Sequence, residues 1–311
     1  YHVLIVLFKD FLHVLGGIFG WVLYAAYWLV HNYGLAILIF TIFTKLIFFP
    51  TTIKQQKSMA QNARLSSQMQ ALKEKYGTNR EKLNEETQKL YEKEGVSPYS
   101  GCLTSLLPMF LLLGVFYAVA YPLTNTLHID AAMVENARQA LTAVPGLNLS
   151  ASQQYGGQVD ILLYFNAFPS VQSCFSPDMV EKISEFSNSF NLCGLNLLVS
   201  PSQLGFSWYL IIPFLCFATS VASQVVMQKM NGSGAQAQQG CMKLMIYGLP
   251  LFSAYIAYTV PAAVGFYWIC STAISFIQSI IVHKYFGPDM MIARGEAARV
   301  ALLEKQESLV K

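Results

Sequence analysis

The sequence contains few charged residues. Asp, Glu, Lys and Arg make up 12% of its 311 residues, against about 25% in an average globular protein, and 54% are hydrophobic. A large soluble core is the alternative explanation for so many apolar residues, but too few polar residues remain to cover one. Apolar runs of nearly membrane-spanning length also recur along the chain. The composition therefore predicts an all-α polytopic membrane protein.

The apolar runs also lack carboxylates. No Asp or Glu lies within the predicted spans, and the five histidines lie at or beyond their ends. Proton-coupled transport and metal chemistry within the bilayer normally need such groups. A Ser/His pair at membrane depth and a Walker-type phosphate loop are missing as well. We therefore expect a protein that is not an enzyme and uses no metal or cofactor.

Five segments are predicted to be transmembrane helices. They are residues 34–53, 101–123, 206–228, 243–260 and 262–283. Between the first two spans, residues 54–94 carry nine Lys and Arg, whereas residues 125–204 carry two. Positive charge accumulates in cytoplasmic loops, so we expect 54–97 and the tail 284–311 inside the cell and 125–204 outside.

The N-terminal residues 1–33 are apolar but interrupted by Lys9, Asp10, His13 and His31. A sixth span here would invert every charge assignment above. We expect an amphipathic helix in the outer interface, with its Trp and Tyr side chains at headgroup depth and the N-terminus outside. The sequence begins at Tyr1, and we expect a signal or anchor segment upstream of it.

Residues 54–97 are predicted to form a cytoplasmic helical hairpin. Residues 55–75 contain no Pro or Gly, Gly77-Thr78-Asn79 supplies a break with a new N-cap, and charges alternate from Arg80 to Glu94. Apolar positions are sparse and include Met59 and Met69. A solvated charged loop that only sets topology is the alternative.

A single lysine interrupts the first predicted span. Lys45 lies eleven positions after Gly34, about 16 Å into the span at 1.5 Å per residue. A lone cation at this depth is costly and marks a candidate functional site. Snorkelling is the alternative, although a four-carbon stem reaches the headgroups only from near the ends of a span.

Neutral polar side chains could line a water-filled groove around Lys45. The candidates are Thr41 and Thr44 in the same span and Ser220 and Gln224 in the third. Interhelical hydrogen bonding is their alternative role. We favour five transmembrane helices around a water-filled, hydrophilic groove lined by these side chains.

Several short motifs follow one another in a specific order. They are Asn32-Tyr33-Gly34-Leu35-Ala36-Ile37, Lys45, Phe49-Pro50, Ile53-Lys54-Gln55-Gln56-Lys57-Ser58-Met59, Leu90-Tyr91, Gly95-Val96-Ser97-Pro98, Gly101-Cys102-Leu103, Leu249-Pro250-Leu251-Phe252 and Val264-Gly265-Phe266-Tyr267-Trp268-Ile269-Cys270-Ser271. In this order they resemble the YidC family of membrane protein insertases, which has mitochondrial and chloroplast relatives. The resemblance extends over about two thirds of the chain.

The resemblance implies an insertase or chaperone without a motor of its own. Hydrophobic segments of nascent membrane proteins would pass from the cytoplasm into the lipid bilayer through a positively charged groove. Lys45 would attract acidic residues of the substrate, and Met59 and Met69 would make the first contact. Tyr267 and Trp268 would touch the passing helix, with ordinary packing as their alternative role.

The resemblance further implies a location in a bacterial plasma membrane, with the N-terminus outside and the C-terminus inside. The Sec translocon and the ribosome are candidate partners, and no direct recognition of nucleic acid is expected. Two other functions stay open. One is a channel or passive transporter that uses the same cavity, and the other is an assembly chaperone without insertion activity.

Three features depart from the family. An arginine usually stands where this chain has Lys45, the segment 125–204 is longer than usual, and the tail after Lys284 is only weakly basic. The long segment has two cysteines, Cys174 and Cys193, on the oxidising side. We expect them to form a disulfide, with two free thiols as the alternative. Apolar runs in this segment predict a helical cap rather than a disordered linker.

Overall fold

Helices make up most of the structure. The computed structural model describes residues 2–54, 68, 71–76, 79–94, 113–147, 149, 157–230, 248–286 and 300. The chain divides into two units. The first comprises Tyr1–Leu46, Met109–Val225 and Gly240–Ile274, and the second comprises Ile47–Pro108, Val226–Gln239 and Ser275–Lys311.

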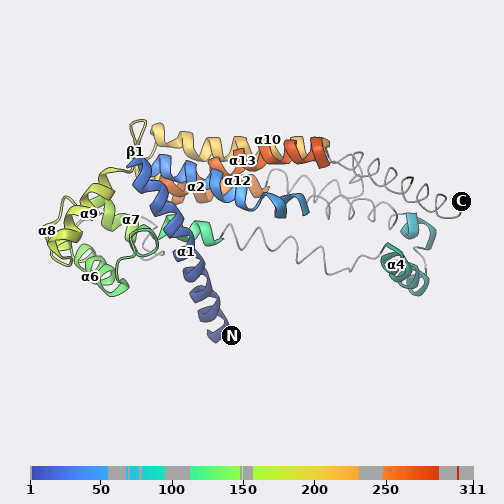
Figure 1. Ribbon diagram of the computed structural model, residues 1–311, viewed down its shortest axis with the longest axis horizontal. Helices are drawn as coiled ribbons and strands as arrows, with labels where there is room; N and C mark the ends of the chain where they lie inside the picture. Colours follow the sequence, from blue (N-terminus) through green and yellow to red (C-terminus); the bar gives the residue numbers. More distant parts are fainter. Residues whose placement is uncertain are drawn as a thin grey trace, which may run out of the picture. The chain divides into compact units, whose positions relative to one another are not determined.

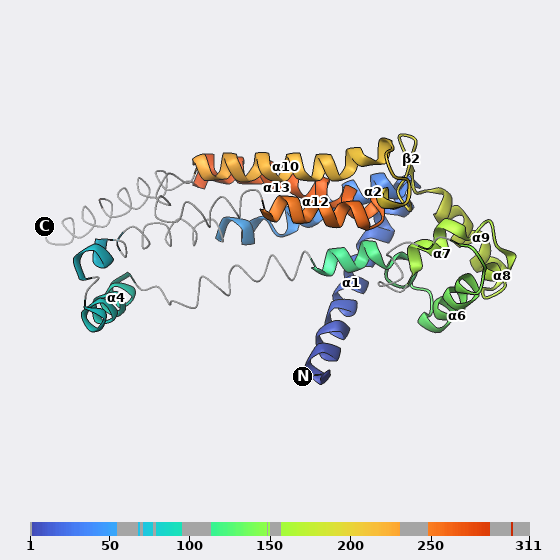
Figure 2. The same cartoon turned by 180° about the vertical axis from the view of Figure 1, so that it is seen from behind.

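Three helices within the described residues are long and apolar enough to cross a membrane. They are α1 (His2–Val30) over Asp10–Val30, α10 (Ile211–Met230) with the turn before it over Trp208–Val226, and α13 (Ala262–Phe286) over Ala262–Tyr285. Shorter helices are α2 (Tyr33–Ile47) and α12 (Leu249–Thr259). Figures 1 and 2 show α2, α10, α12 and α13 running alongside one another.

The predicted spans correspond to these helices in part. The third and fifth match α10 and α13, whereas α2 ends at Ile47, six residues before the predicted end at Ile53. A turn at Phe48 separates α2 from a further helical stretch at 49–54. Much of the second predicted span, and the start of the fourth, lie outside the described residues. The fold is therefore a helical membrane protein, and the number of five spans stays a prediction.

The N-terminal helix α1 packs closely against a π-helix, η1 (Pro122–Thr126). A Cβ on Gly20 would collide with the backbone of Asn125, so only glycine allows this approach. The rings of Phe19 and Phe40 meet edge to face with centroids 6.2 Å apart, which joins α1 to α2. The helix predicted for residues 1–33 is thus present. Its length and hydropathy would also allow it to cross a membrane. Its location in the outer interface therefore stays a prediction.

The long segment 125–204 contains several helices. They are α6 (Ala131–Thr142), α7 (Gln158–Tyr164), α8 (Pro169–Gln172) and α9 (Pro177–Asn188), and a short hairpin of β1 (Asn191–Leu192) and β2 (Leu195–Asn196) follows. In the antiparallel hairpin Asn191 pairs with Asn196 and Leu192 with Leu195. We call residues 131–199, which run from α6 to just after β2, the outer domain, after the outside location that the charge distribution predicts for them.

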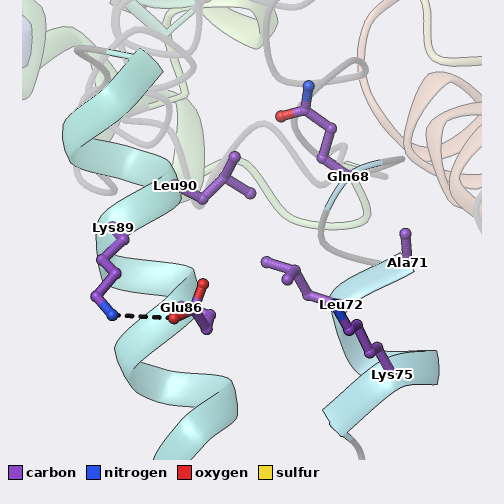
Figure 3. Close-up of a pocket in the computed structure, with 7 residues that line it drawn as sticks. All are labelled: Gln68, Ala71, Leu72, Lys75, Glu86, Lys89 and Leu90. Atoms are coloured by element: carbon purple, nitrogen blue, oxygen red, sulfur yellow. Dashed lines mark hydrogen bonds and ion pairs between the residues drawn. The ribbon is translucent and has the colours of Figure 1, made fainter.

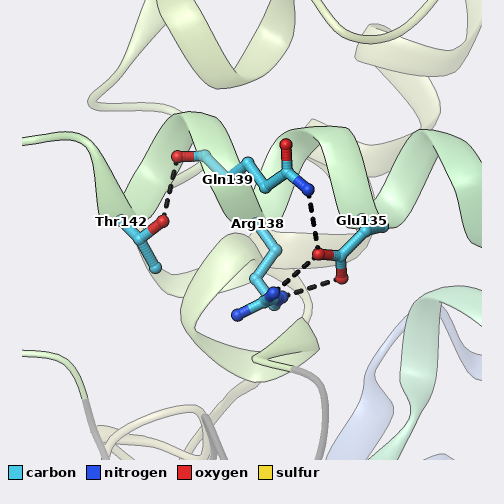
Figure 4. A network of polar contacts seen from close by, with 4 residues as sticks. All are labelled: Glu135, Arg138, Gln139 and Thr142. Carbon is cyan, nitrogen blue, oxygen red and sulfur yellow. Dashed lines mark hydrogen bonds and ion pairs between the residues drawn. The ribbon is translucent and has the colours of Figure 1, made fainter.

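The outer domain has an apolar core of its own. Ile161, Phe165, Ile183 and Phe186 are completely buried, as the apolar runs of the sequence predict. On its surface, Arg138 donates two hydrogen bonds to Glu135, of 2.6 and 2.8 Å, and Gln139 donates a third (Figure 4). These donors lower the pKa of the Glu135 carboxyl to about 2. The described part of the segment is therefore folded around a core of its own.

Backbone hydrogen bonds tie the outer domain to the start of two apolar helices. Tyr33 N at the start of α2 donates to Ser189 O over 3.0 Å, and Ala263 N at the start of α13 donates to Leu197 O over 2.8 Å. The Gln158 side chain also accepts from the backbone N–H groups of Leu123 and Thr124 in η1. The outer domain therefore sits at the end of the bundle where α2 and α13 begin.

The disulfide predicted between Cys174 and Cys193 is absent, and both cysteines are free. Cys174 precedes α9 and Cys193 follows it at the tip of the β-hairpin. A helix of 12 residues is about 18 Å long, whereas bonded cysteines have Cα atoms about 4.4–6.8 Å apart. The helix between the two cysteines holds them apart, so the disulfide prediction is wrong for this structure.

The predicted hairpin, residues 54–97, belongs to the second unit, and the structure describes part of it. Residues 71–76 are helical, and α4 (Arg80–Glu94) follows. Asn79 is the N-cap of α4, because its side-chain oxygen accepts from Lys82 N and its carbonyl from Leu83 N. The predicted break before Arg80 is confirmed.

Candidate functional site

The helix α2 has one buried face and one exposed face. Buried residues recur every three or four positions and include Ile37, Phe40, Thr41 and Thr44. The opposite face exposes large apolar side chains: Leu35, Ile39, Ile42, Phe43 and Leu46. This arrangement is typical of a helix that packs on protein with one face and meets lipid with the other.

Lys45 lies at the border of the buried face. It is half-buried, directly follows Thr44, and is four positions after Thr41. Residues four positions apart are neighbours on the surface of a helix. Lys45 and Thr41 are therefore neighbours on α2, and the grouping of Lys45, Thr41 and Thr44 in one groove stays a prediction.

The two threonine hydroxyls donate to their own helix. Thr41 Oγ1 donates to Ile37 O over 2.6 Å, and Thr44 Oγ1 lies 2.9 Å from Phe40 O and 3.1 Å from Thr41 O. Because each hydroxyl proton is used in this way, the oxygen lone pairs remain to accept hydrogen bonds. An ammonium group carries three donors and no acceptor. The ammonium can thus donate to a carboxylate or to water, whereas the two hydroxyl oxygens can accept only from a donor such as water.

The polar candidates on α10 share one face. Ser220 and Gln224 are four positions apart, and both are half-buried. α10 comes close to α13, because a Cβ on Gly265 would lie 2.6 Å from Ile212 Cγ2. Grouping Ser220 and Gln224 into one groove with Lys45 stays a prediction.

The two aromatic candidates on α13 differ in exposure. Tyr267 is only 3% exposed and shares a hydrogen bond with Ser271 one turn further on. Trp268 is half-buried. Tyr267 is thus packed within the bundle, and contact with a passing helix stays a prediction for both residues. Ser271 lies four positions after Tyr267, a spacing that places the two side chains on the same face of α13.

The hairpin contains a pocket of about 400 Å³ (Figure 3). Leu72 and Leu90 point into the gap between the two helices, and Gln68, Ala71, Lys75, Glu86 and Lys89 complete the lining. Lys89 Nζ lies 2.8 Å from Glu85 and 3.0 Å from Glu86, and this pairing raises the pKa of the lysine. Met59 and Met69, predicted to capture substrate, lie outside the described residues.

Comparisons with known proteins identify relatives along most of the chain. The model of the family described as 60Kd inner membrane protein matches residues 25–289. ALBINO3-like protein 1, chloroplastic, of Arabidopsis thaliana is 27% identical over 259 residues, which are 83% of this chain and 44% of the relative. Membrane protein insertase YidC of Treponema denticola is 26% identical over 284 residues, which are 89% of this chain and 38% of the relative.

A shorter relative is matched over most of its own length. Membrane protein insertase YidC of Caldanaerobacter subterraneus subsp. tengcongensis is 25% identical over 252 residues, which are 81% of this chain and 85% of that protein. The chain spans less than half the length of the Arabidopsis and Treponema relatives. The two bacterial relatives are named membrane protein insertase YidC, and the Arabidopsis relative is named as a chloroplastic protein. The chain belongs to the 60Kd inner membrane protein family, a family of multi-pass, non-enzymatic membrane protein insertases that includes YidC.

Proposed function

We propose that this protein passes hydrophobic segments of new membrane proteins from the cytoplasm into the bilayer along a groove that contains Lys45. One observation carries the proposal beyond family membership. A half-buried lysine lies beside two buried threonines in a helix whose opposite face is wholly apolar. Such a cation is costly in lipid and is expected where water or an anionic partner meets it.

The physical task is to move polar residues of a substrate partway across the bilayer. An Asp at the centre of a membrane helix costs about 3 kcal/mol on insertion scales. A hydrogen bond to a charged group contributes about 1.5–3 kcal/mol. One contact with Lys45 therefore offsets much of the cost of one carboxylate. The Thr41 and Thr44 oxygens, together with Ser220 and Gln224, would hold water around both charges.

The driving force comes from the substrate. Each Leu or Ile of a substrate helix contributes about 0.3–0.6 kcal/mol on entering the bilayer. No covalent bond is made or broken, and the protein lowers only the barrier. Trp268 and Tyr267 would contact the apolar helix as it leaves the groove towards lipid.

The hairpin would make the first contact with the substrate. Its pocket offers Leu72 and Leu90 to an apolar side chain, and the predicted Met59 and Met69 would add adaptable thioethers. By the distribution of Lys and Arg, the hairpin and the tail lie in the cytoplasm and the outer domain lies outside. We further propose a bacterial plasma membrane as the location, and the Sec translocon and ribosome as partners.

Reconstitution tests this function directly. The purified protein is placed alone in liposomes with a small single-span substrate, and insertion is scored by protease protection. Protection that depends on the protein supports an insertase. A channel would instead conduct ions or solutes without a substrate, and an assembly chaperone would protect only substrates that are already inserted. Either of those results would replace the proposal.

A further inference from the structure

The loop between the outer domain and α10 presents large apolar side chains to the surroundings. Leu204 is 47% exposed and Trp208 is 72% exposed. Phe206 is 102% exposed, so no described residue covers its side chain. A soluble surface rarely displays three such side chains within five residues. We call residues 204–208 the aromatic loop.

The conformation of the aromatic loop is well defined. The 3-10 helix η3 (Pro201–Gln203) precedes it, and the Gln203 side chain accepts a hydrogen bond from Ser200 N over 3.2 Å. Gly205 has a φ of +60°, a left-handed conformation that redirects the chain before Phe206. Tyr209 turns the other way, because its hydroxyl accepts from Asn196 N over 2.8 Å. The loop is therefore held at both ends while its apolar side chains project outward.

The position of the aromatic loop matches the edge of the membrane. Trp208 is the first residue of the span candidate that continues through α10. η3 packs against α12, and Ala262 N at the start of α13 donates to Val199 O just before η3. The loop thus lies at the level where α10 and α13 begin and α12 ends. This is where a bundle of membrane helices emerges from the hydrocarbon.

The chemistry of the loop also favours lipid over a protein partner. The sequence has no charged residue between Glu185 and Lys229. Trp is enriched at membrane interfaces, where its ring and its N–H meet apolar and polar surroundings at once. We propose that the aromatic loop inserts into the outer leaflet at the boundary of headgroups and acyl chains. There it seats the outer domain on the lipid surface and fixes the depth of α10.

A fluorescent amino acid that reports its surroundings can test this proposal. It is placed at position 206 or, as a matched control, at Ser170, an exposed residue of α8 in the outer domain. Both proteins are reconstituted alone into liposomes made of phospholipids. Quenching is measured with aqueous iodide and with nitroxide groups attached to the lipid acyl chains near the headgroup.

The two positions should respond in opposite ways. The reporter at 206 should lose most of its fluorescence to the nitroxide lipid and little to iodide, whereas the reporter at 170 should respond mainly to iodide. Equal iodide quenching at both positions would overturn the proposal. Protection of position 206 from iodide without quenching by nitroxide lipid would also overturn it, because a second copy of the protein would then cover the loop.

Discussion

Removing the charge at position 45 should slow insertion selectively. Lys45→Ala removes the ammonium of a half-buried residue that follows Thr44 directly and Thr41 by four positions on α2. The lost interaction with a substrate carboxylate is about 1.5–3 kcal/mol. Because about 1.4 kcal/mol corresponds to a factor of ten, insertion of a substrate with one acidic residue in its outer tail should slow by about ten- to a hundredfold.

The matched variant is Lys45→Arg. It keeps the charge and adds a planar fork of donors, so it should retain most of the activity. Lys45→Glu should impair acidic substrates more than Lys45→Ala does, because two carboxylates repel each other. A substrate whose tail has a neutral Asn or Gln in place of the acidic residue should lose much less than its acidic counterpart in all variants.

The assay is a time course of protease protection in liposomes with the two substrates side by side. Thermal unfolding in detergent confirms that each variant is folded. The reasoning is refuted if folded Lys45→Ala inserts the acidic substrate at the normal rate. It is also refuted if the acidic and neutral substrates slow equally, since the lysine would then act through the structure of α2 alone.

Three further predictions follow from the structure. Replacing Arg64–Glu92 with a short Gly/Ser linker should leave the apolar helices folded but lower crosslinking to substrate; unchanged insertion would reduce the hairpin to a topological signal. Gly20→Ala should lower the free energy of unfolding by about 1–3 kcal/mol, because the added Cβ collides with η1. Gly17→Ala is the control, because a Cβ there meets nothing within 4 Å. Equal melting temperatures of the two variants would argue against the α1–η1 contact. Alkylation without reductant, followed by mass mapping, should modify both Cys174 and Cys193. If both cysteines react only after reduction, they form the disulfide and the structure is wrong at this point.

Patterns of local sequence predicted the helical elements well. Asp130 is the N-cap of α6 and Pro177 is the first residue of α9, positions at which these residue types are favoured. Asn79 marked the start of α4 for the same reason. The periodicity of α2 likewise predicted the neighbourhood of Lys45, Thr41 and Thr44, because residues four apart share a helix face.

Features that depend on contacts distant in sequence could not be predicted. The need for a glycine at position 20 arises only from the contact with η1, which is distant in sequence. The disulfide prediction counted residues between Cys174 and Cys193, and it ignored the rigid length of α9 between them. The burial of Tyr267 depends on how α13 packs in the bundle, which the local sequence does not specify. Family resemblance gave no guidance on the outer domain.

The central claim is that position 45 lies in a hydrated groove rather than in lipid. Thiols react with small charged methanethiosulfonate reagents only where water reaches them, because the thiolate is the reactive form. The measurement compares Lys45→Cys with Phe43→Cys, a position on the exposed apolar face of α2, in liposomes that contain the protein alone. The account predicts rapid modification at position 45 above the level of the unsubstituted protein, and little at position 43. Equal protection of both positions, or faster modification at position 43, would contradict it.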